Sequence, residues 1–120
     1  MEKENNDKIR IEYNHKIAET EQRMDMLSST RRQMRELYDN LEGELTRDSR
    51  KLQNLTNELI QGGNREARWF QEELIDRQRK FNQAFQQASQ EFWQQCTRRN
   101  EELNEEHLQF QKERNELPWD

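Results

Sequence analysis

The chain has 120 residues, of which 29% are hydrophobic and 38% are charged, and its formal net charge at pH 7 is −5. So polar a composition excludes a large compact core, and acidic and basic residues are too evenly mixed to form the basic stripe of a nucleic-acid-binding protein. Disorder is the competing interpretation, but the apolar residues recur at regular spacing and proline occurs only once, at Pro118. The composition therefore favours one all-α domain of long helices, each of which buries a narrow apolar stripe.

The first half of the chain predicts one helix over about residues 5–61. Its apolar residues recur in alternating steps of four and three, which is an unbroken heptad repeat. A straight helix drifts by about 20° per heptad against such a repeat, so we expect a left-handed supercoil with a second helix. Gly43 lies inside this helix and off the stripe, either as a tolerated surface glycine or as a point where a partner helix comes close. The stripe consists of Tyr13, Ile17, Thr20, Met24, Leu27, Arg31, Met34, Tyr38, Leu41, Leu45, Asp48, Leu52, Leu55 and Leu59.

A turn is predicted at residues 61–64, the midpoint of the chain. Gly62 and Gly63 supply the backbone freedom that a reversal of direction needs. The chain is therefore predicted to be a single domain, residues 1–120, folded into a long antiparallel two-helix hairpin with the character of a coiled coil.

The second half predicts a helix over about residues 65–117. Asn64 can cap its amino terminus. Pro118 cannot continue a helix and disfavours helical geometry at the residue before it, so Trp119 and Asp120 are expected to form a short tail. The stripe of this helix consists of Phe70, Leu74, Arg77, Phe81, Phe85, Ala88, Phe92, Cys96, Arg99, Leu103, His107, Phe110, Arg114 and Leu117.

Folding at the turn sets the two stripes against each other, with facing residue numbers that add to about 125. Asp48, the one acidic residue of the first stripe, then lies opposite Arg77, a basic residue of the second. A partly buried charge is costly without a partner. We therefore expect an Asp48–Arg77 ion pair that fixes the register of the hairpin.

Five large apolar residues lie off the two stripes and form the predicted partner interface. Two of them are eighteen residues apart on the second helix, which is five turns, so they lie at the same angle. Since two helices cannot bury both a stripe and a flanking edge, these residues are either scattered surface residues or the place where a second helical pair docks into a four-helix assembly. Tryptophan is a frequent interface anchor, which favours docking. The five residues are Ile11, Met26, Trp69, Ile75 and Trp93.

No combination of residues suited to catalysis is evident, so we expect no enzyme, no cofactor and no metal site. Glu12 and His15 have the spacing of a di-iron bundle, but the stripe places His15 outward. His107 lies on the stripe and is expected to be a hydrogen-bonded histidine rather than a catalytic one. Cys96 is the only cysteine, so an internal disulfide is impossible.

The sequence also bears on the compartment. No apolar run exceeds two residues, so neither a transmembrane helix nor the core of a signal peptide is predicted. We expect the chain to start in the cytoplasm, and any export to use a non-classical route.

Two long helices joined by a glycine turn, in a small acidic chain without a signal peptide, resemble the WXG-type helical hairpins of type VII secretion. The likeness covers the whole chain. The closing segment, residues 113–120, more narrowly resembles small helical proteins encoded beside LXG toxins of Gram-positive bacteria. This resemblance implies a targeting factor that binds the helical amino-terminal domain of an LXG toxin, or a sister small helical protein, for type VIIb secretion.

Two departures from the family pattern shape this expectation. The turn has no Trp-x-Gly motif, and the export signal, an aromatic residue followed four positions later by an acidic one, is absent from the tail, where Phe110 is followed by Arg114. The pattern favours a chaperone-like accessory subunit that travels with its partner. The alternative is a self-associating structural coiled coil. Whether the hairpin is closed or opens into a swapped dimer stays open.

Overall fold

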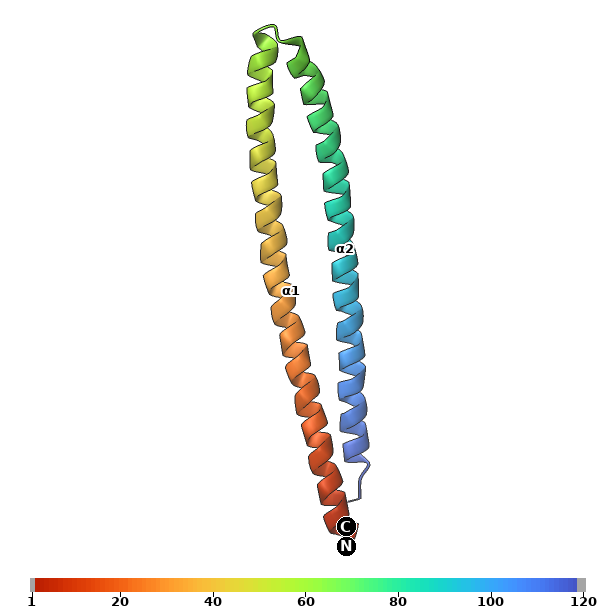
Figure 1. The fold of residues 1–120 in the computed structure, drawn as a ribbon. Helices are drawn as coiled ribbons and strands as arrows, with labels where there is room; N and C mark the ends of the chain where they lie inside the picture. Colours follow the sequence, from red (N-terminus) through yellow and green to blue (C-terminus); the bar gives the residue numbers. More distant parts are fainter. Residues whose placement is uncertain (1, 119–120) are drawn as a thin grey trace. The chain divides into compact units, whose positions relative to one another are not determined.

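The computed structural model describes residues 2–118, and the predicted tail of Trp119 and Asp120 lies outside the described residues. Two helices, α1 (Glu2–Gln61) and α2 (Arg65–Asn115), make up nearly all of the described chain (Figure 1). Residues 2–118 contain no β-strand. The prediction of an all-α fold built from two long helices that form a hairpin is therefore confirmed.

Both helices pass through two compact units. The turn unit consists of residues 34–92 and contains the reversal of the chain, and the end unit combines residues up to 33 with residues from 93 onward. Each unit has its own pairing of α1 with α2, so each is described by itself below.

The turn is a Schellman motif, the arrangement in which a left-handed glycine ends a helix. Gly63 has a φ of 91°, its N–H donates to Ile60 O at 3.0 Å, and Asn64 N–H donates to Leu59 O at 3.1 Å. These bonds satisfy carbonyl oxygens that would otherwise be left without partners at the end of α1. Asn64 then starts α2, because its Oδ1 accepts a hydrogen bond from Ala67 N at 3.2 Å.

The other end of α2 also follows from local chemistry. The helix ends at Asn115, two residues before the predicted boundary at Leu117. The N–H of Leu117 donates to Arg114 O at 3.2 Å, a tighter final turn than that of an α-helix. Pro118 follows, and it disfavours helical geometry at the residue before it.

The end unit has a small core in which the two predicted stripes face each other. The buried side chains are Ile17 and Thr20 of α1 and Cys96 and Leu103 of α2, and Leu103 is 1% exposed. The Thr20 hydroxyl donates to Lys16 O at 2.8 Å, so a polar group can lie in this core without an unsatisfied hydrogen bond.

Polar contacts across the helices of the end unit fix its pairing. His107 Nε2 lies 3.0 Å from Glu21 Oε1, so the histidine is hydrogen-bonded as predicted for a stripe position. Arg114 Nη1 donates to Asn14 Oδ1 at 3.0 Å. Next to this pair, a hydrogen bond with Glu113 raises the pKa of the Tyr13 hydroxyl, and burial adds to the shift.

Replacement of Gly63 by alanine is expected to destabilise the hairpin by about 1–2 kcal/mol, because a Cβ is strained in the left-handed conformation. The measurement is the free energy of unfolding from urea denaturation monitored by circular dichroism. Gly62→Ala is the matched control: its added Cβ would meet Leu59 O at 3.4 Å, an ordinary contact, and Gly62 does not have the left-handed φ of Gly63. Equal losses in the two variants would contradict the assignment of Gly63 as the residue that the turn requires.

Candidate partner-binding face

Besides Trp69 and Ile75, the turn unit exposes seven large apolar side chains. They are 40–57% exposed, although six of the seven belong to the stripes that the sequence predicted to be buried. We call this set the leucine face. It consists of Leu37, Leu41, Leu52, Leu55, Leu59, Phe70 and Phe81.

Polar residues take the place of the leucines between the helices. On α1, Ser49 and Gln53 are half-buried and Thr56 is 5% exposed. Gln53 Nε2 donates to Gln78 Oε1 of α2 at 3.3 Å, and Thr56 Oγ1 donates to Leu52 O at 2.9 Å. These residues form a polar seam between Leu45 and Ile60, two half-buried apolar residues that stay between the helices, where an unbroken apolar seam was predicted.

The shift from leucines to polar residues has a geometric cause. The seam positions of α1 in this part of the unit advance in steps of four, four, three and four, from Leu45 to Ile60. This spacing is that of a helix that is not underwound, whereas the leucines keep a period of 3.5 and rotate away by about 20° per heptad. The predicted supercoil would have kept the leucines in the seam.

The leucines of α1 and the phenylalanines of α2 lie on the same side of the turn unit. At 3.6 residues per turn, the leucines lie about 90° around α1 from the polar seam, and Phe70 and Phe81 lie about 60° around α2 from its seam, in the same rotational sense. Because the two helices are antiparallel, equal senses of rotation point to one common side. The leucine face is therefore one surface with two rows.

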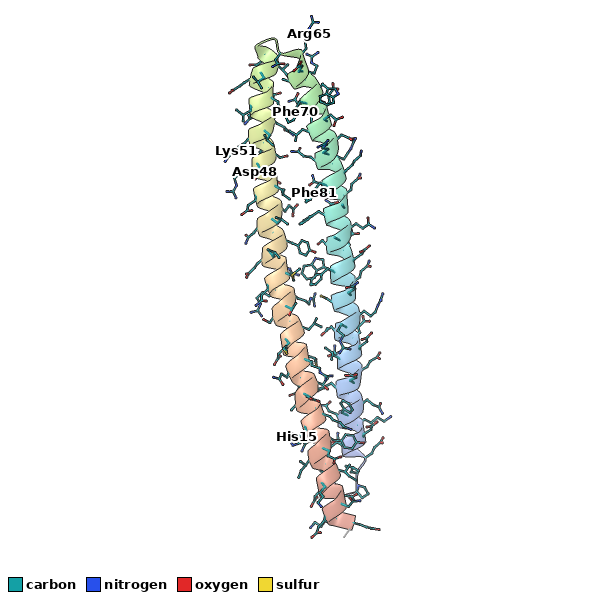
Figure 2. The ribbon with its side chains drawn as sticks, in the orientation of Figure 1. His15, Asp48, Lys51, Arg65, Phe70 and Phe81 are labelled. Atoms are coloured by element: carbon teal, nitrogen blue, oxygen red, sulfur yellow. The ribbon has the colours of Figure 1, made fainter. Side chains whose placement is uncertain are left out.

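A groove runs between the two rows. It has a volume of about 480 Å³, and its lining includes Leu52 and Phe81 together with the polar pair Gln53 and Gln78. Phe81 projects from α2 toward α1 (Figure 2). Because Leu52 and Phe81 have no protein atoms against them on the solvent side, their dispersion contacts on that side are not made.

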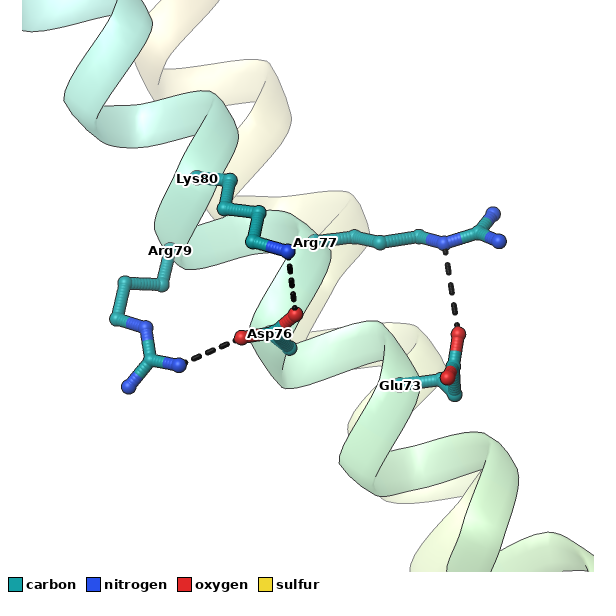
Figure 3. Close-up of polar contacts among 5 residues, drawn as sticks. All are labelled: Glu73, Asp76, Arg77, Arg79 and Lys80. Carbon is teal, nitrogen blue, oxygen red and sulfur yellow. Dashed lines mark hydrogen bonds and ion pairs between the residues drawn. The ribbon is translucent and has the colours of Figure 1, made fainter.

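Three charged residues, Asp48, Arg50 and Arg77, line the same groove. Asp48 and Arg77 do not form the predicted register pair. Arg77 Nε lies instead 3.7 Å from Glu73 Oε2 on its own helix, and the Arg77 side chain is 81% exposed (Figure 3). The reason is the rotation just described, which turns both stripe positions out of the seam. The register is held by the glutamine pair and by Gln71 Nε2, which donates to Asn57 Oδ1 at 2.6 Å.

The residues predicted as the partner interface do not form one surface within either unit. Trp69 is 65% exposed and Ile75 is 47% exposed, but six residues separate them, which is about 120° around α2. Ile11 and Met26 are 55% and 63% exposed in the end unit, about four helical turns apart. Trp93 is half-buried, and the Arg31 guanidinium lies 5.7 Å from its ring centroid.

Sequence reasoning missed the leucine face because it assigned its residues to the core. A usable signal was present in the row of small and amide side chains Ser49, Gln53 and Thr56, which matches the seam more closely than the leucines do. Polar residues at helical spacing beside a leucine row indicate that one of the two rows must be exposed in an isolated hairpin.

The leucine face consists of apolar side chains, which can contact another apolar surface. Among residues 2–118, no three His, Cys, Asp or Glu side chains come together to hold a metal ion. In the same range, neither helix contains a stretch apolar enough to cross a membrane. Cys96 is buried in the end unit, whereas the leucine face belongs to the turn unit.

Comparisons with known proteins add no relative. No protein-family model, curated protein or solved structure matches this chain. The resemblance to type VII secretion hairpins thus rests on the sequence features alone.

Beside the groove, Asp76 interacts with two cations on the exposed side of α2. Its carboxylate lies 3.0 Å from Lys80 Nζ and 2.6 Å from Arg79 Nη2 (Figure 3). The hydrogen bond with Lys80, followed by that with Arg79, lowers the pKa of Asp76. A lowered pKa means that the carboxylate stabilises the folded state above its unfolded pKa, and that this contribution is lost as pH falls through the folded pKa.

We expect Asp76→Asn to lower the Tm slightly at neutral pH, and the difference from wild type to vanish once Asp76 is protonated in both folded and unfolded chains. Thermal melts at a series of pH values from neutral to strongly acidic test this. Glu72→Gln is the control, since Glu72 forms no ion pair within residues 2–118 and should show no such pH-dependent difference. A deficit of Asp76→Asn that persists unchanged at strongly acidic pH would contradict the electrostatic origin.

Proposed function

We propose that this protein is a helix-binding adaptor without a catalytic role, and that its leucine face takes up a helical partner. The observation that carries the proposal is the exposure of seven large apolar residues on one side of the turn unit. With about 200 Å² for a fully exposed leucine or phenylalanine, the face exposes roughly 700 Å² of apolar surface, more than the largest patch of a typical monomer.

The form of the face favours a helical occupant. Its two rows follow two neighbouring helices, and the groove between them can receive the ridge of side chains on a packed helix. A partner with an apolar stripe at helical spacing would contact both rows and produce a bundle of more than two helices. The four-helix assembly expected from the sequence belongs to this proposal.

The resemblance stated above gives the proposal a specific form. In that form the partner is the helical amino-terminal domain of an LXG toxin or a sister WXG-like protein, met in the cytoplasm and carried to the type VIIb apparatus. The alternative is a self-associating structural coiled coil, which the same exposed face supports. Trp69, Ile75, Ile11 and Met26 are exposed enough to extend a contact beyond the leucine face.

The double variant Leu52→Asp/Leu55→Asp is expected to weaken partner binding by roughly a hundredfold, because two apolar contacts are lost and two charges are placed on the face. The measurement is capture by the tagged full chain from native host lysate, identification of the captured chain by mass spectrometry, and titration of that purified chain.

Leu108→Asp is the matched control. Leu108 is 64% exposed and lies in the end unit, so the same chemical change off the leucine face should leave binding intact. Circular dichroism checks that the double variant keeps its helix content. Full binding by a folded double variant would contradict the proposed function.

A further inference from the structure

We propose that, in the absence of another partner, the leucine face is covered by the leucine face of a second copy of this chain. The two turn units lie parallel, related by a two-fold axis that runs along the helices. This inference rests on the proposed function for the use of the face, and it adds the occupant and its orientation.

The apolar area suits a dimer of this kind. Two leucine faces together would remove roughly 1,400 Å² from water, which lies within the range of about 1,200–2,000 Å² for stable protein interfaces. A single added helix in the groove would contact the inner edges of both rows and leave their outer edges exposed. A second hairpin has two apolar rows of its own, so both rows of the leucine face in each copy would be covered.

The parallel two-fold axis follows from the arrangement of the rows. Rotation about an axis along the helices places α1 of each copy over α2 of the other. Every helix then has only antiparallel neighbours, as it would about a perpendicular axis, so the helix dipoles are compatible with this arrangement. The leucine row of one copy meets the row that contains Phe70 and Phe81 in the other, which mixes large aromatic and aliphatic side chains across the interface.

The charges on the face select the same arrangement. Asp48 and Arg77 line one groove, so they lie within the same short stretch of the turn unit. The parallel two-fold axis sets Asp48 of each copy opposite Arg77 of the other, and it does so twice because the contact is isologous. A two-fold axis perpendicular to the helices would instead set the leucine row of one copy against the leucine row of the other. Asp48 would then face α1 of the other copy, which carries Asp48 and not Arg77.

Both residues are available for such pairs. Within residues 2–118, Asp48 forms no ion pair, and the pair of Arg77 with Glu73 is long and largely exposed. Each intermolecular pair would lie at the edge of an apolar contact that partly excludes water, where a charge pair is screened less than on an open surface. The Asp48–Arg77 pair that the sequence predicted within one chain would therefore form between two chains.

The first test is the mass of the full chain in solution. Sedimentation equilibrium across micromolar concentrations is expected to give a species of twice 14.9 kDa that dissociates on dilution. Leu55→Asp should give a monomer with unchanged helix content, because Leu55 is 57% exposed and contributes little to the fold of one chain. Trp69→Ala, off the face, should stay dimeric. A wild-type chain that is monomeric throughout overturns the inference.

The decisive test is a charge exchange between copies. Asp48→Arg and Arg77→Asp alone are each expected to weaken the dimer by about tenfold or more, because each homodimer then holds two like-charge pairs. An equimolar mixture of the two variants should restore dimers near wild-type affinity, since the mixed dimer regains both Asp–Arg pairs between the chains. No ion pair within either chain is restored in the mixture.

The possible results separate the inference from the proposed function. A mixture as weak as either variant alone overturns the parallel two-fold arrangement. A monomeric wild-type chain that still captures its helical partner through Leu52 and Leu55 overturns the dimer and leaves the proposed function standing. Capture that is insensitive to the leucine face, combined with an intact dimer, overturns the proposed function for a foreign partner and leaves the dimer standing.

Discussion

The structure of the turn unit depends on the difference between two periods, 3.5 residues for the leucine repeat and about 3.6 for a helix that is not underwound. Two helices that do not supercoil can keep a heptad stripe in contact only over a short length. Beyond that length the seam passes to whichever residues lie next around the helix. In the turn unit these are Ser49, Gln53 and Thr56; Gln53 bonds across the seam and Thr56 bonds back to its own helix. The exposed leucines are the direct result.

The same difference in period explains which parts of the structure could be predicted from the sequence. In the end unit the predicted stripe positions Ile17, Cys96 and Leu103 are the buried ones, and the turn at Gly62 and Gly63 lies where two adjacent glycines placed it. Both depend on short-range information, either local turn chemistry or the stripe over a few turns. The orientation of Leu52, Leu55 and Phe70 depends on accumulated rotation over several turns. An error of 20° per heptad is enough to exchange a buried row for an exposed one.

The Asp48–Arg77 prediction failed for a related reason. Two opposite charges at matching stripe positions indicate that the charges will meet, but the pattern of a single sequence does not say whether they meet within one chain or between two. The structure places both residues on one groove without pairing them. The candidate site could therefore be predicted in most of its composition, because all of its residues except Leu37 were identified as stripe residues, but not in its exposure.

The division of the chain into units has a consequence for the order in which it folds. The turn unit is continuous in sequence, residues 34–92, so its contacts close short loops that begin at the Schellman turn. The end unit joins the first residues of the chain to the last, and its pairing requires closure of a much longer loop unless the turn unit is already formed. Local contacts form before distant ones. Pairing that starts at the turn and proceeds outward along both helices is the fastest route. On the ribosome, residues 2–33 must wait for the residues from 93 onward to be synthesised before their apolar side chains are covered.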